Sequence, residues 1–312
     1  MARSIVVVGS LNLDLVARVE HLPRAGETLA ARSFASALGG KGANQSVACG
    51  RLGADVHMIG RVGTDSFGEQ LRSDTAGAGV DVTCVEAVEG PSGLAMITID
   101  EEAQNSITVV AGANEQLTAH ALRRHGAVVR DAAVVLAQLE TPLETVLLIS
   151  EMAQAGGIPF VLDPAPARAL PAELLRRVTW LTPNESESRA LLGDASLRAP
   201  DRTEEIALAL LATGCRNVVL KLGAVGVFLA GADVPPTRVE GYRVDAVDTT
   251  AAGDAFNGAF AVALSEGQSP LRSAHFACAA AAISVTRHGA AAAMPNRSEV
   301  EAFMARNGSI RR

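Results

Sequence analysis

The chain has 312 residues, of which 48% are hydrophobic and 20% are charged, so it can form one large or two small globular domains with a well-buried core. Aromatic residues make up only 3%, which leaves Ala, Val and Leu to fill that core. The formal net charge of −7 excludes the broad basic surface that nucleic acids require, so any phosphate site must be local. The four cysteines include no CxxC pair and the six histidines no HExxH motif, which argues against a structural zinc site or a disulfide framework.

Targeting signals are not evident in the sequence. The apolar run Ile5–Val8 is too short for the core of a signal peptide and is soon followed by Asn12. No segment approaches the roughly 20 apolar residues of a membrane span. We therefore expect a cytoplasmic protein with reduced thiols, without a membrane or nucleic-acid partner.

The first predicted element is a buried strand at Ile5–Val8, of the kind found in parallel sheets. Asn12 and Asp14 follow its carboxyl end, which is where α/β proteins bind their ligands. They are equally typical of a turn, so both interpretations stay open at this point.

A glycine-rich loop, residues 37–46, opens a predicted helix that runs to about Leu52. It is not a Walker A loop, because Lys41 is followed by Gly42 and the chain contains no GxxxxGK[ST]. Adjacent glycines allow backbone N–H groups to face a ligand, and Lys41 and Asn44 add side-chain donors. A hydroxyl-rich ligand fits this chemistry as well as a phosphate does; the alternative is a turn with a surface lysine.

Several short segments alternate between polar and apolar residues more than the buried runs do, and no helices separate the last three. They predict a small sheet, contributed by about residues 12–36 and 82–110, that lies as a lid over the main body and excludes water from a site. Its exposed apolar face favours a homodimer. The segments are Thr28–Phe34, Val82–Glu86, Leu94–Asp100 and Ser106–Val110.

From Asn114 onward strands alternate with helices, which predicts a mostly parallel sheet covered by helices on both faces. Right-handed crossovers place the carboxyl ends of such strands at one edge. We therefore expect Asn12, Glu140, Asn184 and Glu187 to gather there. The predicted strands are Val56–Ile59, Ala133–Leu136, Pro159–Leu162, Trp180–Leu181, Val218–Lys221 and Val227–Leu229, and the later helices include Leu143–Ala155, Thr203–Thr213, Pro270–Val285 and Arg297–Arg306.

The segment Val247–Gly258 contains two carboxylates, two hydroxyls and the small residues Ala-Ala-Gly directly before Asp254. It opens a predicted helix, Ala255–Leu264, whose first turn offers unpaired N–H groups and the positive end of the helix dipole. That arrangement binds anions without a basic side chain. Asp254 is then either a proton acceptor beside a phosphate or an ordinary helix cap.

Together these loops resemble the ribokinase, or PfkB, family of sugar and nucleoside kinases. The similarity covers nearly the whole chain, from about Ile5 to Phe303, and its motifs are specific in combination. The motifs, in order, are Ser10–Asp14, Gly39–Gln45, Gln138–Glu140, Asp163–Ala167, Thr182–Glu187 and Asp248–Gly258.

The resemblance implies a single α/β kinase domain over residues 1–312, with a three-layer α/β/α fold, a β lid and ATP-dependent phosphorylation of the 5-hydroxyl of D-ribose. Asp254 would accept the hydroxyl proton, and the backbone of Ala251, Ala252 and Gly253 would stabilise the phosphoryl charge. The implied sugar contacts are Asn12, Asp14, Gly40, Lys41, Asn44, Glu140 and Asp254.

The same resemblance implies ATP, Mg²⁺ and a monovalent cation, usually K⁺. Glu187 would help to place Mg²⁺, although Asn184 and Glu187 also read as a helix-capping pair. The implied ATP contacts are Asn184, Lys221, Gly223, Gly226, Ala252, Gly253 and Cys278, and the implied K⁺ ligands, mostly backbone carbonyls, are Asp248, Thr250, Ser284, Arg287 and Gly289.

The chain departs from the family pattern at three positions. Ala293 stands where a serine hydroxyl often lies near the cation, which puts the K⁺ geometry in question. Lys221 replaces a common threonine and either reaches an ATP phosphate or is a surface residue, and Cys278 replaces a histidine that can flank adenine. Two rival hypotheses remain: a kinase for deoxyribose, a hexose or a nucleoside, and a non-catalytic sugar-binding protein.

Overall fold

A computed structural model describes residues 4–102, 104–194 and 202–308 of the chain. Within these residues, nine strands form a central sheet in the order β13-β12-β11-β10-β9-β8-β1-β4-β5. The strands from β5 to β11 are parallel, whereas β12 and β13 add antiparallel pairs at one edge. They are β1 (Ser4–Val8), β4 (Val56–Gly63), β5 (Val85–Val88), β8 (Ala132–Ala137), β9 (Phe160–Leu162), β10 (Trp180–Leu181), β11 (Asn217–Lys221), β12 (Gly226–Gly231) and β13 (Thr237–Glu240).

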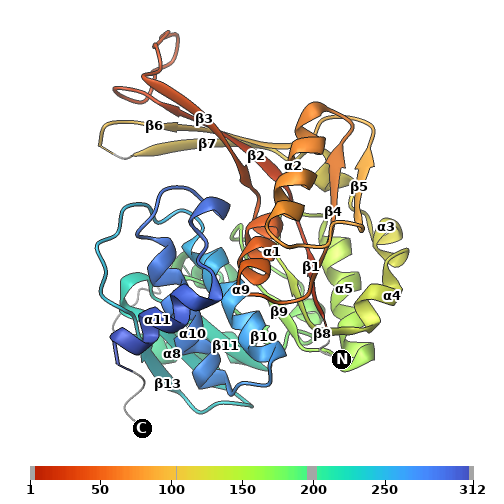
Figure 1. The fold of residues 1–312 in the computed structure, drawn as a ribbon. Coiled ribbons are helices and arrows are strands. Elements are labelled where there is room, and N and C mark those ends of the chain that lie inside the picture. The colour runs from red at the N-terminus through yellow and green to blue at the C-terminus, as the bar shows by residue number, and fades with distance from the viewer. Residues whose placement is uncertain (1–3, 103, 195–201, 309–312) are drawn as a thin grey trace.

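Helices cover both faces of this sheet, which confirms the predicted three-layer α/β/α fold (Figure 1). In β1, Ile5 and Val7 pack on one helical layer while Val6 and Val8 pack on the other, so the strand is apolar at all four of these positions. One layer contains α1 (Lys41–Arg51), α2 (Ser66–Gly77), α9 (Ala252–Ser265), α10 (Pro270–Ser284) and α11 (Arg297–Arg306). The other contains α3 (Ala119–Arg123), α4 (Gly126–Arg130), α5 (Leu143–Gly156), α6 (Ala172–Leu175), α7 (Glu185–Leu192) and α8 (Thr203–Ala212).

A second sheet of four strands, in the order β3-β2-β6-β7, projects from the top of the body above the side that carries α10 and α11 (Figure 1). Several of its large apolar side chains are exposed, including Phe34, Met96 and Ile107. The predicted lid therefore exists as a separate sheet. Its strands are β2 (Asn12–Arg18), β3 (Ser33–Gly39), β6 (Gly93–Ile99) and β7 (Asn105–Val110).

Two of the predicted lid segments were wrong. Val82–Glu86 does not enter the lid: β5 pairs in parallel with β4 at the edge of the central sheet, where Val85 is buried. Thr28–Phe34 is mostly irregular, and the strand lies further along, at Ser33–Gly39, because it pairs with β2, which was not predicted as a strand. Short half-buried strands carry too weak a pattern to show which sheet they join.

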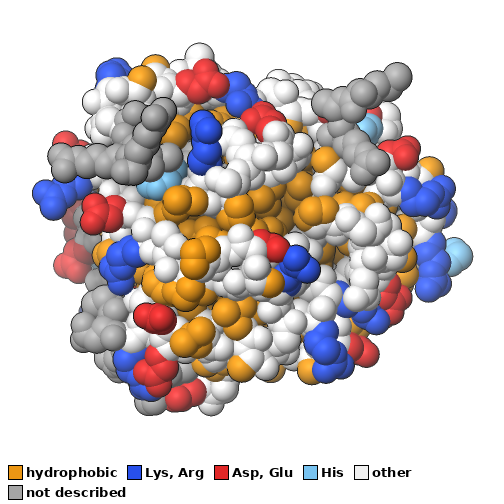
Figure 2. All heavy atoms as spheres, turned by 90° about the horizontal axis from the view of Figure 1, so that it is seen from below, with side chains coloured by type: hydrophobic (Ala, Val, Ile, Leu, Met, Phe, Trp, Pro, Cys, Tyr) orange, Lys and Arg blue, Asp and Glu red, His pale blue; other side chains and the backbone are white. Residues whose placement is uncertain are grey.

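The face of the molecule away from the lid has a mixed surface. Figure 2 shows hydrophobic side chains across the middle of this face, with Lys and Arg interspersed among Asp and Glu around it. None of the described helices is long and apolar enough to cross a membrane.

Candidate active site

A cleft of about 600 Å³ opens at the carboxyl ends of the parallel strands, as the alternation of strands and helices predicts. Its walls come from segments that are distant in sequence: the start of α1, the ends of β9 and β11, the starts of α7 and α9, and α10. The lining includes Lys41, Asp163, Asn184, Glu187, Lys221, Gly223, Gly226, Ala251, Ala252, Gly253, Asp254 and Cys278.

Asp254 is the third residue of α9 and is 5% exposed. Its two carboxylate oxygens accept hydrogen bonds from neighbouring residues of α1: Oδ2 from Asn44 Nδ2 at 3.0 Å, and Oδ1 from Gln45 Nε2 at 2.9 Å. Burial raises the pKa of Asp254 to about 6, although Lys41 and the two amides favour its ionised form. The side chain is thus held in one orientation and is a stronger proton acceptor than an exposed aspartate.

The loop before α9 has a strained backbone. Ala251 adopts a left-handed conformation with φ of 58°, which costs a non-glycine residue about 1 kcal/mol or more. Beyond it, the N–H groups of Gly253 and Asp254 make no backbone hydrogen bond within the described residues, while the Ala252 N–H lies 3.3 Å from the Thr249 carbonyl. Free donors at the start of a 14-residue helix form an anion site.

The lid and the glycine-rich loop meet next to Lys41 and Asp254, in a region called the deep end below. Of the predicted sugar contacts, Lys41 and Asp254 line the cleft itself, whereas Asn12, Asp14, Gly40, Asn44 and Glu140 are not among its lining residues. Asn12 begins β2, is 4% exposed, and its Oδ1 accepts a hydrogen bond from Asn114 Nδ2 at 2.8 Å. Glu140 accepts hydrogen bonds from the Ser10 hydroxyl and, at 3.0 Å, from the Lys41 N–H. Gly40 has φ of 85°, and a Cβ there would lie 2.8 Å from the Asn12 nitrogen, so this close approach requires glycine.

Charges at this deep end interact strongly. Burial, followed by the nearby carboxylates of Glu140 and Asp254, raises the pKa of Asp14 to about 7. Burial alone would lower the pKa of Lys41, but the surrounding carboxylates, Asp254 first, raise it. Lys41 therefore stays charged, and its ammonium group offsets part of the negative charge of the pocket.

At the other end of the cleft, Asn184 and Glu187 form the capping box of α7 that the sequence allowed. Glu187 Oε2 accepts the Asn184 N–H at 2.7 Å, and burial raises the pKa of Glu187 against the opposing effect of Lys221. Lys221 is not a surface residue. Its ammonium group lies 3.0 Å from Asp163 Oδ1 and 4.0 Å from Glu187 Oε2, with its side chain 14% exposed.

Small residues complete the wall beside Lys221. Gly226 has φ of 108°, and a Cβ there would lie 2.1 Å from the Val239 carbonyl, so the turn after β11 can hold only glycine. Gly223 opens the same turn, and Cys278 lines the cleft from α10. Burial raises the pKa of the Cys278 thiol to about 12, which makes it an unreactive apolar contact.

The donor set of the cleft suits a divalent cation bound together with phosphates. The described residues contain no cluster of three or more metal-ligating side chains, so the protein alone does not build a complete metal cage. Mg²⁺ commonly keeps several waters and takes one or two carboxylates plus substrate phosphates. Glu187 and Asp163 line the cleft as carboxylates, and a polyanion entering beside them requires a compensating cation.

Asp248 connects two of the other residues predicted to hold K⁺. Its Oδ1 accepts the Thr250 N–H and its Oδ2 accepts the Gly289 N–H, both at 2.9 Å. Burial opposes ionisation, but these hydrogen bonds keep the pKa of Asp248 below its usual value. In the turn after α10, the Ser284 carbonyl accepts the Arg287 N–H at 3.2 Å.

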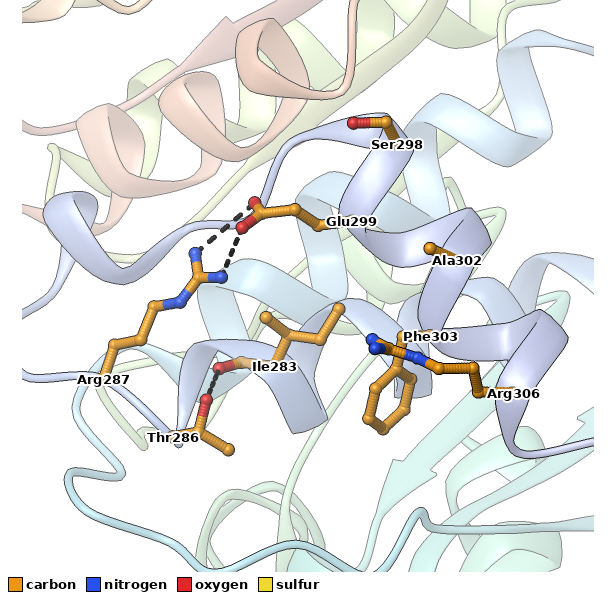
Figure 3. A pocket seen from close by; sticks show the side chains of 8 residues that line it. All are labelled: Ile283, Thr286, Arg287, Ser298, Glu299, Ala302, Phe303 and Arg306. Carbon is orange, nitrogen blue, oxygen red and sulfur yellow. Dashed lines mark hydrogen bonds and ion pairs between the residues drawn. The ribbon is translucent and has the colours of Figure 1, made fainter.

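The Arg287 side chain points away from this loop. Figure 3 shows it paired with Glu299 across a second hollow, which lies between α10 and α11 and is separate from the cleft. Arg287 could therefore contribute to a cation site only through its backbone.

Three buried polar residues that hold the site together were not predicted as site residues. Asn114 anchors the start of β2, Gln45 contacts Asp254, and Asp163 pairs with Lys221. Gln45 and Asp163 lie within the quoted motifs, but spacing alone does not show which motif residues face a ligand and which face one another. Asn114 lies outside the motifs, and nothing in the sequence marks it.

Comparisons with known proteins agree with this geometry. The family model for pfkB family carbohydrate kinases matches residues 2–297. This chain belongs to that family. It is 39% identical to the ribokinase of Haemophilus influenzae over 97% of this chain and 99% of that protein, and 41% identical to the ribokinase of Bacillus subtilis over the same shares.

Solved structures of carbohydrate kinases extend the likeness to the fold. The ribokinase of Thermotoga maritima superposes with a TM-score of 0.89 at 39% identity, covering 97% of this chain and 99% of that one. The ribokinase of Arabidopsis thaliana, solved with ribose and ATP, has a TM-score of 0.90 at 33% identity and the same coverage. The ribokinase-like α/β fold with its lid is therefore shown.

Proposed function

We propose that this protein is an ATP-dependent kinase that phosphorylates the 5-hydroxyl of D-ribose. The observation that carries the proposal is Asp254: a buried carboxylate, oriented by two amides, at the start of a helix whose free N–H groups face a cleft. Full-length similarity to ribokinases, including one solved with ribose and ATP, supports the choice of substrates.

Asp254 orients the 5-hydroxyl and accepts its proton as the sugar oxygen attacks the γ-phosphorus. The bond between that phosphorus and the oxygen bridging to the β-phosphate breaks, and ADP leaves with the bond's electron pair. A sugar hydroxyl is a weak acid, so most of the proton transfer accompanies a late stage of attack. The N–H groups of Gly253 and Asp254, with the adjoining backbone of Ala251 and Ala252, stabilise the charge on the transferring group.

The sugar lies at the deep end of the cleft, among Asn12, Asp14, Gly40, Lys41, Asn44 and Glu140. Asn44 supports this placement in particular: its Nδ2 donates to Asp254, while its buried Oδ1 has no partner among the described residues. A sugar hydroxyl would satisfy that acceptor, and an analogue without the hydroxyl would leave it unpaired, which strongly disfavours binding.

ATP occupies the remainder of the cleft, with its phosphates beside Asn184, Lys221, Ala252 and Gly253 and its base among Gly223, Gly226 and Cys278. A Mg²⁺ ion bound with ATP would neutralise phosphate charge beside Glu187. A K⁺ ion would sit behind the anion loop, held by Asp248 and by carbonyls of Thr250, Ser284, Arg287 and Gly289.

Two further parts of the proposal concern assembly and location. The exposed apolar residues of the lid favour a homodimer through the two lids, which light scattering would test; a monomer at micromolar concentration would contradict it. The absence of long apolar helices in the described residues and the buried free thiols fit a cytoplasmic enzyme.

The test of the function is a coupled assay of ADP release with ribose, deoxyribose, fructose and adenosine. We expect the highest kcat/KM with ribose. Faster turnover of another substrate would identify a different sugar or nucleoside kinase, and ribose binding without any turnover would identify a non-catalytic sugar-binding protein.

A further inference from the structure

Gln45 lies behind the proposed proton acceptor and away from the cleft. It is 0% exposed, and the nitrogen and the oxygen of its amide are both engaged by other protein side chains, so the amide is not available to a substrate. Its Nε2 donates to two carboxylates at once, Asp254 Oδ1 and Asp163 Oδ2, each at 2.9 Å. The amide of this α1 residue thereby connects the end of β9 with the start of α9.

The orientation of the Gln45 amide is itself determined by a neighbour. Gln138 Nε2, just after β8, donates to Gln45 Oε1 at 2.7 Å. If the Gln45 amide were turned over, its oxygen would face the two carboxylates and its NH₂ group would face the NH₂ group of Gln138. The observed orientation is therefore the one that pairs every donor with an acceptor. Hydrogen bonds to charged groups are stronger than those between neutral groups, which helps to hold this arrangement.

The far side of the bridge reaches the phosphate end of the cleft. Asp163 holds the Lys221 ammonium group at 3.0 Å, and a Cβ added to Gly253 would lie 3.4 Å from that group. The Lys221 charge therefore lies close to the loop proposed to stabilise the transferring phosphoryl group. Gln45 thus connects the residue beside the nucleophile with the cation beside the phosphoryl group.

We propose that Gln45 is a positioning residue that aligns Asp254 with the anion loop by holding Asp254 and the Asp163–Lys221 pair in one geometry. This inference rests on the proposed kinase function. It extends that function, because it assigns a catalytic contribution to a residue that contacts no substrate. The other charged groups that face Asp254 are Lys41 from α1, Asp163 from the end of β9 and Asp14 from the lid.

The test compares wild type, Gln45→Met and Gln45→Glu, with Ser46→Ala as the matched control. Gln45→Met keeps the volume but removes both donated hydrogen bonds. Ser46 is the next buried residue of the same helix, and its hydroxyl donates to the Gly42 carbonyl rather than to a carboxylate. Initial rates are measured against ribose at saturating ATP from about pH 5 to about pH 9, with thermal unfolding as the check on folding.

For Gln45→Met we expect kcat to fall on the order of 100-fold, because a small misplacement of a reacting group has an effect of that size, while the ribose KM changes less than about threefold. The acid limb of kcat/KM should move to higher pH, since the amide that stabilises ionised Asp254 is lost. Gln45→Glu, which keeps the side-chain shape but adds an acid, should move the limb further. Ser46→Ala should leave both readouts near wild type.

Wild-type kcat and an unmoved acid limb in either Gln45 variant would overturn the inference and leave Gln45 as packing only. If Gln45→Met does not fold, Gln45→Glu decides the question. Failure of the proposed function is separable, because wild type is assayed with the whole sugar panel: turnover of another sugar corrects the substrate, and the Gln45 variants are then compared on that sugar. No turnover by wild type with any sugar would overturn both proposals.

Discussion

The two ends of the cleft differ in the kinds of protein groups that form them. At the sugar end, buried and half-buried side chains carry the polar groups, and each of Asn12, Glu140 and Asp254 has a hydrogen-bond partner. At the nucleotide end, the paired side chains of Asn184, Glu187, Lys221 and Asp163 lie beside a wall of glycine turns, backbone N–H groups and an unreactive thiol. Paired side chains discriminate between substrates, whereas backbone and shape bind a ligand that is common to a whole family.

The largest expected effect lies where the two ends meet. Asp254→Asn keeps the shape and the helix start but removes the proton acceptor, so kcat should fall by about 10²–10⁴. The ribose KM should stay within a few-fold of wild type, because the amide still occupies the same place. Steady-state kinetics check this, and an unchanged kcat would exclude Asp254 as the proton acceptor.

The pH dependence of wild type sharpens the same point. Because the pKa of Asp254 is raised to about 6, the carboxylate is ionised only above that pH, and kcat/KM for ribose should decline as the pH falls through about 6. Asp14, whose pKa is raised to about 7, titrates together with it. A profile that stays flat down to about pH 5 would show that neither carboxylate must be ionised.

Asp14→Asn separates binding from stability at the sugar end. Removing the charge should raise the ribose KM by about tenfold or more, since a hydrogen bond to a charged group is lost. The wild-type pKa is raised on folding, so ionised Asp14 destabilises the folded protein above its unfolded pKa of 3.8, fully so above about 7.

The ligand-free Asp14→Asn variant should consequently be more stable than wild type by roughly 1–2 kcal/mol near pH 8, a figure reduced for partial solvent exposure, and equal to wild type near pH 4. Thermal unfolding at the two pH values measures the difference. A variant that is less stable than wild type near pH 8 would contradict the account of a destabilising carboxylate.

The loop behind the anion site should respond to the identity of the salt. We expect K⁺ to activate over Na⁺ at fixed ionic strength by about fivefold or more, a typical coupling between two sites. Asp248→Asn should weaken that preference. Equal wild-type rates in the two salts would show that Ala293, in place of a serine, has removed the selectivity of the site.

The smallest effect is expected at the nucleotide end. Cys278→Ala removes an apolar contact of about 1 kcal/mol, so the ATP KM should rise by no more than about fivefold while the ribose KM is unchanged. A large change in the ribose KM would contradict the division of the cleft into two ends.

The same division explains what the sequence could predict. Most of the central sheet and its helices follow from continuous apolar runs such as Ile5–Val8, and the motifs contain several residues that line the cleft, such as Lys41, Glu187 and Asp254. Loops rich in glycine, aspartate and asparagine are also typical of turns and helix caps, so only the combination of several such motifs in one order indicated a ligand.

What could not be predicted depends on contacts between distant segments. The pattern of Val82–Glu86 does not show whether it joins β4 or the lid, since pairing is decided by three-dimensional packing. Gln45 and Asn114 are buried amides whose side-chain partners lie between 93 and 209 residues away, and no local spacing encodes them. The sequence left open whether Lys221 is a surface residue or a site residue. The answer depends on the neighbouring ends of β9 and β11, which bring Asp163 beside it.

The central claim is that Asp254 directs the γ-phosphoryl group of ATP to the 5-hydroxyl of ribose. The most direct measurement is phosphorus NMR of the product made by wild type from ribose and ATP, with Asp254→Asn run in parallel. The account predicts ribose 5-phosphate from wild type and almost none from the variant. Phosphate on a different hydroxyl, or equal product from both proteins, would contradict it.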